Sequence, residues 1–367
     1  MKKQKYKTSK NKRTVFLVEI VPTTYFQETE YYNKCLKNYS DMGIEILRIN
    51  CTRVSVEEYI YQLDEINKCS NKYNGKKFKF LLDLPIPNAK PRIMFKWPVP
   101  NSRVAKSIGG DSNYFRIDKG ETIHIVRKFD LITDLLQFEI NDFSFFSKVN
   151  VGDIIFVCEN TLSLKIVSKH NDYIALVAQN DGFISYNKAL HTGSVSYVEN
   201  REYEKFKPLI DTMNPEIIAL SFVESGQDII EFKERYSVCN SKILAKIESK
   251  KSVENINDII NEADMLMIGR GDLFINSTYE DFALDIEHVL KMNKNRLPVY
   301  IATGILESLR PNQFEPKKSE LTEILYYLQQ NVSGFILTFG TSQDIKVFNA
   351  ACSIINNMDK NFKNTRI

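Results

Sequence analysis

Short apolar runs rich in β-branched residues alternate with longer amphipathic stretches along most of this chain. Apolar runs of this length without a polar face are typical of strands that are buried on both sides, as in a parallel sheet. The stretches between them carry apolar residues at helical spacing. Strands are therefore predicted at 14–20, 44–50, 78–84, 216–222, 242–247, 264–269, 298–303 and 334–338. Helices are predicted at 25–42, 54–69, 200–212, 226–238, 251–262, 279–293, 317–331 and 342–358.

Strands and helices in this alternating order predict an α/β fold, the (β/α)₈ TIM barrel. One long segment, 87–197, lacks helical patterning and consists of short alternating runs separated by Gly, Asn and Asp. It predicts a small β-rich domain of hairpins, inserted after the third strand. Because barrel enzymes hold their sites in the loops that follow the strands, this inserted domain is expected to act as a lid. The barrel is expected to span 14–86 and 198–360.

Composition and charge narrow the possible classes of function. The chain has 367 residues, of which 43% are hydrophobic and 26% charged, as expected of a globular protein. No apolar run approaches the roughly 18 residues of a membrane span, so no membrane partner is expected. Residues 1–13 carry seven basic side chains and no acidic one, and this tail is predicted to be disordered, with contact to an anionic surface as the alternative. Subtracting those seven from the 49 Lys and Arg leaves 42 against 46 acidic residues, which argues against a nucleic-acid partner.

Cysteine and histidine usage excludes two further kinds of site. The six cysteines contain no C-x-x-C pair and the four histidines are dispersed, so neither a zinc site nor a histidine-centred triad is predicted. The N-terminus carries no secretory signal, so the thiols are expected to stay reduced and the predicted location is cytoplasmic.

Polar residues gather where the predicted strands end. In a barrel the carboxyl ends of all strands meet at one rim, so side chains from distant parts of the sequence are expected to lie close together there. These residues are Arg48, Asn50 and Thr52 at the second strand, Asp83 and Arg92 at and after the third, Lys246 and Glu248 at the fifth, Gly271 and Asp272 after the sixth, and Thr303 at the seventh.

The residue types at this rim indicate phosphate chemistry with a divalent metal. Glu248 and Asp272 offer hard oxygen ligands from adjacent strands, which suit Mg²⁺ or Mn²⁺. Lys246 lies two residues from Glu248, and an ammonium beside a metal suits the charge of a transferring phosphoryl group. Arg48 and Arg92 add planar, multi-donor recognition of phosphate.

Two further groups complete the rim. A turn at Gly271 is expected to aim backbone N–H groups at a carboxylate or a phosphate. The side chains of Asn50, Thr52 and Asp83 carry oxygen atoms that could hold a monovalent cation. The rim as a whole therefore predicts a metal-assisted reaction of a phosphorylated anion.

At these positions the chain resembles the pyruvate kinase family. LRINCT resembles the family's ARLNFS, KILAKIES resembles KIIAKIEN, MLMIGRGDLFI resembles IMVARGDLGI, and VYIATGILESL resembles VICATQMLESM. The order and the intervals of these strings agree, and the predicted inserted domain falls where the family carries its lid domain. The resemblance covers residues 14–345, nearly the whole chain.

The resemblance implies a reaction and a role for each matching residue. The implied reaction is phosphoryl transfer between phosphoenolpyruvate and ADP, with Mg²⁺ or Mn²⁺ and K⁺ as cofactors, and pyruvate and a nucleotide as products. The implied roles are phosphoryl stabilisation for Lys246, phosphate binding for Arg48 and Arg92, divalent-metal binding for Glu248 and Asp272, potassium binding for Asn50, Thr52 and Asp83, enolpyruvate binding for Gly271, Asp272 and Thr303, and nucleotide contact for Pro22, Arg53 and Lys188.

Departures from the family strings leave other functions open. Arg53 stands at the family's nucleotide-contacting histidine, EIVPTT keeps only Pro22 of the family's TIGPAS, and only Lys188 remains of the lid string KGVNLPG. The chain ends at residue 367, so the family's C-terminal effector domain is expected to be absent, with a homodimer or a monomer as the assembly. The alternatives are a phosphotransferase with another acceptor, a metal-dependent lyase acting on pyruvate-type enolates, and a non-catalytic relative.

Overall fold

Two compact units make up the chain. Residues Met1–Pro85 together with Tyr203–Ile367 form the barrel unit, and Ile86–Glu202 form the inserted unit. The domain limits predicted from the sequence stay a prediction, and the basic tail lies outside the described residues. The structure is a computed structural model that describes residues 15–20, 29–51, 56–57, 59–61, 66, 78–86, 91–94, 104–106, 113–127, 136–157, 162–185, 188–192, 203–238, 240–337 and 344–365.

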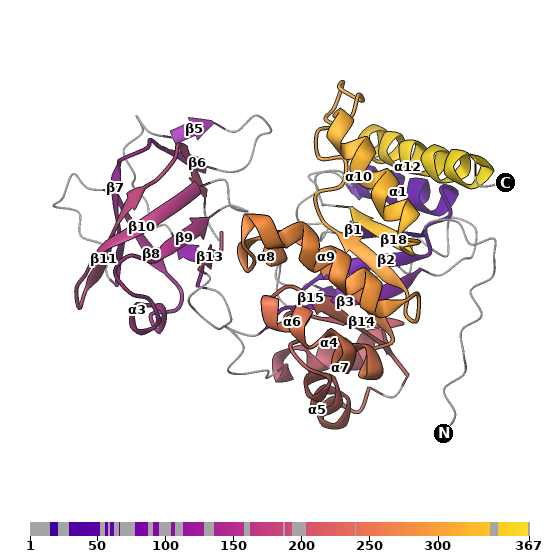
Figure 1. The fold of residues 1–367 in the computed structure, drawn as a ribbon, viewed down its shortest axis with the longest axis horizontal. Helices are drawn as coiled ribbons and strands as arrows, with labels where there is room; N and C mark the ends of the chain where they lie inside the picture. The colour runs from indigo at the N-terminus through magenta and orange to yellow at the C-terminus, as the bar shows by residue number, and fades with distance from the viewer. Residues whose placement is uncertain are drawn as a thin grey trace. The chain divides into compact units, whose positions relative to one another are not determined.

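Parallel strands close the barrel unit into a barrel in the order β1-β18-β17-β16-β15-β14-β3-β2. This closed sheet, with helices following its strands, confirms the predicted fold class (Figure 1). Each of its strands lies within one of the strands predicted from the sequence. They are β1 (Val15–Ile20), β2 (Ile46–Asn50), β3 (Lys79–Leu84), β14 (Ile217–Leu220), β15 (Lys242–Ile247), β16 (Met265–Gly269), β17 (Val299–Ala302) and β18 (Gly334–Leu337).

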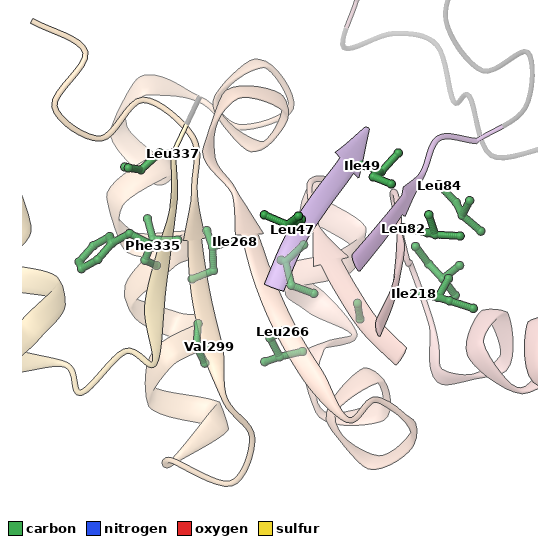
Figure 2. Packing of buried hydrophobic residues seen from close by; sticks show 14 of the residues in the cluster. Leu47, Ile49, Leu82, Leu84, Ile218, Leu266, Ile268, Val299, Phe335 and Leu337 are labelled. Carbon is green, nitrogen blue, oxygen red and sulfur yellow. The ribbon is translucent and has the colours of Figure 1, made fainter. Parts of the chain in front are cut away.

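Side chains alternate along each strand between the barrel interior and the outer layer. The outer layer includes Leu82, Ile218 and Ile268, which belong to the main hydrophobic core, and Figure 2 shows several of these side chains together. Because both faces of each strand are apolar, the strands appear in the sequence as continuous apolar runs. The interior cluster consists of Leu81, Ile217, Ala219, Leu244, Met267, Tyr300, Ala302 and Ile336.

The helices of the barrel unit follow the strands, as Figure 1 shows. The predicted helix at 54–69 is described only in part, and its described residues 56–57, 59–61 and 66 are helical. The others are α1 (Thr29–Asp41), the 3₁₀ helix η3 (Glu204–Phe206), α4 (Lys207–Met213), α5 (Gly226–Tyr236), α6 (Lys250–Glu254), α7 (Ile256–Glu262), α8 (Arg270–Ile275), α9 (Tyr279–Asn293), α10 (Lys318–Gln329) and α12 (Ile345–Thr365).

Three helices differ from the sequence predictions. The helix predicted at 251–262 is divided at Asn255, whose backbone leaves the helical region and whose side chain donates to the carbonyl of Glu224 at 2.8 Å. Helix α8 was not predicted, because six residues are too few for an apolar period to show. Helix α12 continues to Thr365, beyond its predicted end at 358.

The inserted unit is rich in β-structure, as predicted, and has its own buried core. One seven-stranded sheet has the order β13-β9-β10-β11-β7-β8-β4, and a three-stranded sheet has the order β12-β6-β5. Antiparallel hairpins occur as predicted, for example between β9, β10 and β11, whereas β7 and β8 pair in parallel, because alternation along a strand carries no information about its direction. The elements are β4 (Ile93–Met94), β5 (Val104–Lys106), β6 (Asn113–Ile117), β7 (Thr122–Val126), β8 (Leu136–Ile140), α3 (Phe145–Lys148), β9 (Ile154–Val157), β10 (Leu162–Lys169), β11 (Tyr173–Ala178), β12 (Gly182–Ser185) and β13 (Leu190–His191).

Two sequence expectations concern cysteines and membranes. Cys35, Cys51 and Cys352 are buried and form no disulfide with a described residue, and their reduced state stays a prediction. Burial raises the pKa of the Cys35 thiol to about 11, so it stays protonated and unreactive near neutral pH. None of the helices that the structure describes combines the length and the apolarity that crossing a membrane requires.

Phe348 joins the last helix of the barrel to the first. It is fully buried on α12, and its ring meets that of Tyr39 on α1 edge-on, with ring centroids 5.1 Å apart. We predict that Phe348→Ala lowers the free energy of unfolding by about 3–5 kcal/mol, because it leaves a cavity in the core. Urea unfolding measures this loss, and Leu284→Ala, at a side chain 61% exposed, is the control. Equal effects of the two substitutions would contradict the prediction.

Candidate active site

Polar side chains take the last inward positions of several barrel strands. Leu244 faces the barrel interior, so Lys246 and Glu248, two and four residues further along, face the same way. The same alternation leads from Leu81 to Asp83 and from Ala219 to Ser221. The inward polar residues Arg48, Asp83, Ser221, Lys246 and Glu248 are all buried, with at most 9% of each residue exposed.

Asp83 lies between two cations. Its Oδ2 accepts from Nε and Nη2 of Arg48 at 2.9 and 2.6 Å, and its Oδ1 accepts from Nζ of Lys246 at 3.1 Å. Burial pushes the pKa of Asp83 upward, but the charges of Lys246 and Arg48 outweigh it, and the net effect is a lowered pKa. The carboxylate therefore stays ionised in the folded protein.

Lys246 is the centre of the charge network. Besides Asp83, its ammonium meets the hydroxyl of Ser221 at 2.9 Å and Oε1 of Glu248 at 3.0 Å. Burial would lower the pKa of Lys246, but the carboxylates of Asp83 and Glu248 outweigh it and raise this pKa, with a smaller effect of Asp272. Three neighbours match the three donors of an ammonium group. Lys246 is therefore a permanently charged cation in a fixed orientation.

Glu248 is positioned by main-chain features. Its Oε2 accepts the backbone N–H of Phe222 at 3.0 Å, and Phe222 has a φ of +51°, which is uncommon for a bulky residue. Gly269 on the neighbouring strand leaves space for the carboxylate, since a Cβ atom there would lie 2.6 Å from Cγ of Glu248. A Cβ atom at position 269 would therefore require the Glu248 side chain to shift.

Glu248 and Asp272 have the donor chemistry of a divalent-metal site. Asp272 lies in the first turn of α8, directly after the strand adjacent to β15, and its charge acts on Lys246. Among the described residues, no group of three or more His, Cys, Asp or Glu side chains is placed to hold a metal. Two carboxylates suit Mg²⁺ nevertheless, because Mg²⁺ keeps several water or substrate oxygens. The pair therefore fits Mg²⁺ or Mn²⁺, and metal binding itself stays a prediction.

The turn predicted at Gly271 is the first turn of helix α8, and the direction of its backbone N–H groups toward an anion stays a prediction. Gly271 lies within α8, because Leu273, two residues on, is fully buried and draws this segment against the barrel. The backbone of Gly271 is therefore part of a short helix that also carries Asp272.

The predicted potassium site is described only in part, since Thr52 lies outside the described residues. Asn50 is aligned with Asp83 in the register of β2 and β3. The positive charges of Arg48 and Lys246 balance those of Asp83 and Glu248, and Asp272 adds one negative charge close to Lys246. Binding of a monovalent cation here stays a prediction.

Arg270 connects the start of helix α8, which carries Asp272, to the main chain of Thr303. Its Nε donates to the carbonyl oxygen of Thr303 at 2.8 Å, and Nη2 donates to the same oxygen. Its Nη1 pairs with Glu323 on α10. Gly304 makes room for this arrangement, because a Cβ there would lie 2.8 Å from Nη2 of Arg270. The main chain of Thr303 is thereby tied to the start of α8.

The remaining predicted site residues lie in the inserted unit or outside the described residues. Arg92 and Lys188 belong to the inserted unit, where Arg92 bridges to Ala189 and the N–H of Ile93 donates to the carbonyl of Lys188 at 2.9 Å. These two predicted site residues, far apart in sequence, therefore lie on neighbouring segments. Pro22 and Arg53 are outside the described residues.

Ser221 and Gly269 were not predicted as site residues. The alternation of side chains along its strand would have placed Ser221 inward beside Lys246. Gly269 gives no sequence signal of this kind, because the need for glycine comes from a side chain on another strand.

A methyl group at position 269 should displace Glu248. We predict that Gly269→Ala lowers the free energy of unfolding by about 1–3 kcal/mol, because the new Cβ overlaps a carboxylate that Lys246 and the Phe222 N–H hold in place. Gly271→Ala is the matched control: a Cβ there meets nothing within 4 Å. It should raise stability by about 0.4–1 kcal/mol. Urea unfolding of both variants measures whether the free energy of unfolding changes in opposite directions. An unchanged free energy of unfolding in Gly269→Ala would contradict the predicted overlap.

Removing the charge of Asp83 should leave two buried cations without their partner. We predict that Asp83→Asn costs about 3–5 kcal/mol of unfolding free energy at pH 7. Because the folded pKa of Asp83 is lowered, its contribution is complete above the unfolded pKa of about 3.9 and is lost as the pH falls through the folded value. The difference in unfolding free energy between wild type and variant should therefore be constant from neutral pH to about pH 5 and should decrease only in acid.

The control for this prediction is an exposed ion pair. Asp211 pairs with Lys207 on α4 at 2.7 Å, with both side chains about half exposed. Asp211→Asn should change stability by at most about 1 kcal/mol. Denaturant unfolding followed from pH 4 to pH 8 measures both variants. A gap for Asp83→Asn that widens as the pH falls would contradict the sign of the pKa shift.

The sequence of this chain is similar to those of proteins named pyruvate kinase. A family model described as the pyruvate kinase barrel domain matches residues 11–328. A protein named pyruvate kinase from Thermotoga maritima is 24% identical over 310 residues, which are 82% of this chain and 62% of that protein. One of the same name from Borreliella burgdorferi is 24% identical over 340 residues, 90% of this chain and 66% of that protein. Plastidial pyruvate kinase 3 of Arabidopsis thaliana is 23% identical over 310 residues, 83% of this chain and 51% of that protein.

The extent of these matches differs between the chain and its relatives. The chain spans between 51% and 66% of the length of the three relatives named. The family model, in contrast, covers most of the chain, from residue 11 into helix α10. By this match the chain belongs to the pyruvate kinase family.

Proposed function

We propose that this protein transfers a phosphoryl group between phosphoenolpyruvate and a nucleoside diphosphate, with ADP as the expected acceptor. The observation that carries this proposal is Lys246, buried in the barrel interior and bonded to Asp83, Glu248 and Ser221. A fixed cation close to Glu248 and Asp272, the two proposed metal ligands, suits a phosphoryl group whose charge is spread over three oxygens during transfer.

The hydroxyl of Ser221 occupies the position beside Lys246 at which a phosphoryl oxygen is proposed to bind. Of the three neighbours of the ammonium, Ser221 is the only neutral one. If a phosphoryl oxygen replaces the hydroxyl, Asp83 and Glu248 both keep their charge partner. Leaving a buried carboxylate unpaired would cost several kcal/mol, so the hydroxyl is the bond that Lys246 gives up.

Arg48 and Arg92 are proposed to hold the phosphate. Arg48 uses two of its donors on Asp83, which fixes the plane of the guanidinium in the barrel interior. A planar guanidinium with several donors suits the oxygen atoms of a phosphate group. Arg92 belongs to the inserted unit, and its role rests on the sequence resemblance alone.

Glu248 and Asp272 are proposed to bind Mg²⁺ or Mn²⁺. A divalent metal there would supply Lewis-acid stabilisation of charge on the enol oxygen and on the phosphoryl group. Thr303 is proposed to contact the enolpyruvate, with Arg270 holding its main chain in place. K⁺ at Asn50, Thr52 and Asp83 is proposed to enter with the phosphoryl group, whose charge it would balance.

Four further properties stay predictions from the sequence. The nucleotide is proposed to contact Pro22, Arg53 and Lys188, on the inserted unit or outside the described residues. A lid function of the inserted unit and a homodimer are proposed in the same way. A cytoplasmic location also stays a prediction, since a relative of similar identity is named as chloroplastic.

A coupled assay tests the proposed function. Phosphoenolpyruvate, Mg²⁺ or Mn²⁺, K⁺ and each common nucleoside diphosphate in turn would be supplied, and pyruvate formation measured. Turnover that disappears in Glu248→Gln and in Asp272→Asn supports the proposal. Proton exchange into pyruvate without transfer to any diphosphate would favour the metal-dependent lyase or another acceptor. Neither activity would favour a non-catalytic relative.

Lys246→Met should separate two half-activities. The phosphoryl group needs a cation as its bonds loosen, so we predict a loss of about 100- to 1000-fold in kcat for pyruvate formation. Solvent-deuterium exchange into bound pyruvate should stay within about tenfold of wild type, because that charge develops on the oxygen proposed to meet the metal. Both rates would be measured on the same preparation.

Lys242→Met is the matched control. Lys242 begins the same strand, at the opposite end of the barrel, and pairs with Glu216 at 3.3 Å. Because it lies far along β15 from Lys246, its loss should leave both rates near wild type. Circular dichroism and Mn²⁺ binding show whether each variant is folded. Equal loss of transfer and of exchange in folded Lys246→Met would contradict the assigned role.

A further inference from the structure

The side-chain amide of Asn276 joins the main chains of the two carboxylate residues proposed to bind the metal. Its Nδ2 donates to the carbonyl oxygen of Asp272 at 2.8 Å and to that of Glu248 at 3.2 Å. Both partners are carbonyl oxygens, which can only accept, so the nitrogen of the amide must face them. One amide group therefore uses both of its hydrogens to connect the main chain of Glu248 with that of Asp272 in α8.

The position of Asn276 follows from the end of helix α8. Asn276 is the C-terminal cap of this helix, and its backbone N–H donates to the carbonyls of Asp272 and Leu273, both at 3.1 Å. The carbonyl of Glu248 lies just past the end of β15, and Asn276 donates to it from the end of α8.

The residue after Asn276 is anchored separately. The hydroxyl of Ser277 donates to Oδ2 of Asp285 at 2.8 Å, and Oδ1 of the same carboxylate accepts from Lys250 at 2.7 Å. Lys250 lies two residues after Glu248, and Asp285 is buried on α9. The loop that carries Asn276 and the loop that carries Glu248 are thus connected twice, which leaves the amide little freedom to move.

We propose that Asn276 is a positioning residue that sets the distance between Glu248 and Asp272, and so the affinity for the divalent metal. The inference rests on the proposed function of that carboxylate pair. A metal requires its ligands at defined separations, and each carboxylate here is carried by a main-chain segment that the amide holds. Loss of groups that orient metal ligands typically weakens metal binding by about 10- to 100-fold.

The test uses two substitutions at Asn276 and a matched control. Asn276→Leu keeps the size of the side chain but has no donor, and Asn276→Ala serves if the leucine variant does not fold. Asn255→Leu is the control: its amide also donates to a backbone carbonyl at 2.8 Å, but that carbonyl belongs to Glu224. Both asparagines are half-buried, so the two substitutions should lower the melting temperature to a similar extent.

The measurement is the dissociation constant of Mn²⁺ alone, by electron paramagnetic resonance, on the full chain without substrate. The expected result is binding to wild type that Glu248→Gln abolishes, that either Asn276 variant weakens by about 10- to 100-fold, and that Asn255→Leu leaves unchanged. Wild-type affinity in the folded Asn276 variants would overturn the inference and leave the metal site standing. An equal loss in Asn255→Leu would also overturn it, since the effect would then be general.

The remaining outcome separates this inference from the proposed function. If wild-type protein does not bind Mn²⁺, or binds it equally well in Glu248→Gln, the metal site itself is wrong. The inference then falls with it. Weakened binding confined to the Asn276 variants is therefore the one result that supports both.

Discussion

The buried charges of the barrel interior constrain the rest of the barrel unit. Arg48, Asp83, Lys246 and Glu248 form a chain of alternating sign that is almost removed from water. Each such charge costs several kcal/mol to bury, and the cost is offset only where the partners meet with good geometry. The strands β2, β3 and β15 that carry them must therefore keep one relative register. A small slip of any of them would leave a charge unpaired.

The net charge of these side chains also determines which charged ligands the site favours. Two cations and two anions cancel, and Asp272 adds one negative charge close to Lys246. A divalent metal beside Glu248 and Asp272 would make the site positive, which favours an anionic substrate. A phosphorylated enol acid brings the opposite charge. Metal and substrate are therefore expected to favour the binding of each other, because each removes the charge imbalance that the other creates.

Much of the barrel could be predicted from the sequence, because a strand with two apolar faces produces a continuous apolar run. The inward direction of Lys246 and Glu248 follows from the same alternation. The division at Asn255 could not be predicted, since it depends on a carbonyl of another segment. Helix α8 was missed because it is short, and the parallel pairing of β7 and β8 because strand patterns carry no direction. The roles assigned to Arg53 and Pro22 depend on residues that the structure does not describe.

The matching strings name the charged residues but not what holds them in place. Glu248 depends on a glycine of the next strand, on the N–H of Phe222, and on an asparagine past the end of α8. At position 269 this chain has glycine where the resembling family string has alanine, so its Glu248 occupies space that a methyl group would fill. Retention of a lysine and two carboxylates is therefore not sufficient to retain their geometry. Whether the chemistry persists in a divergent chain depends on these uncharged neighbours, because they decide where the charges stand.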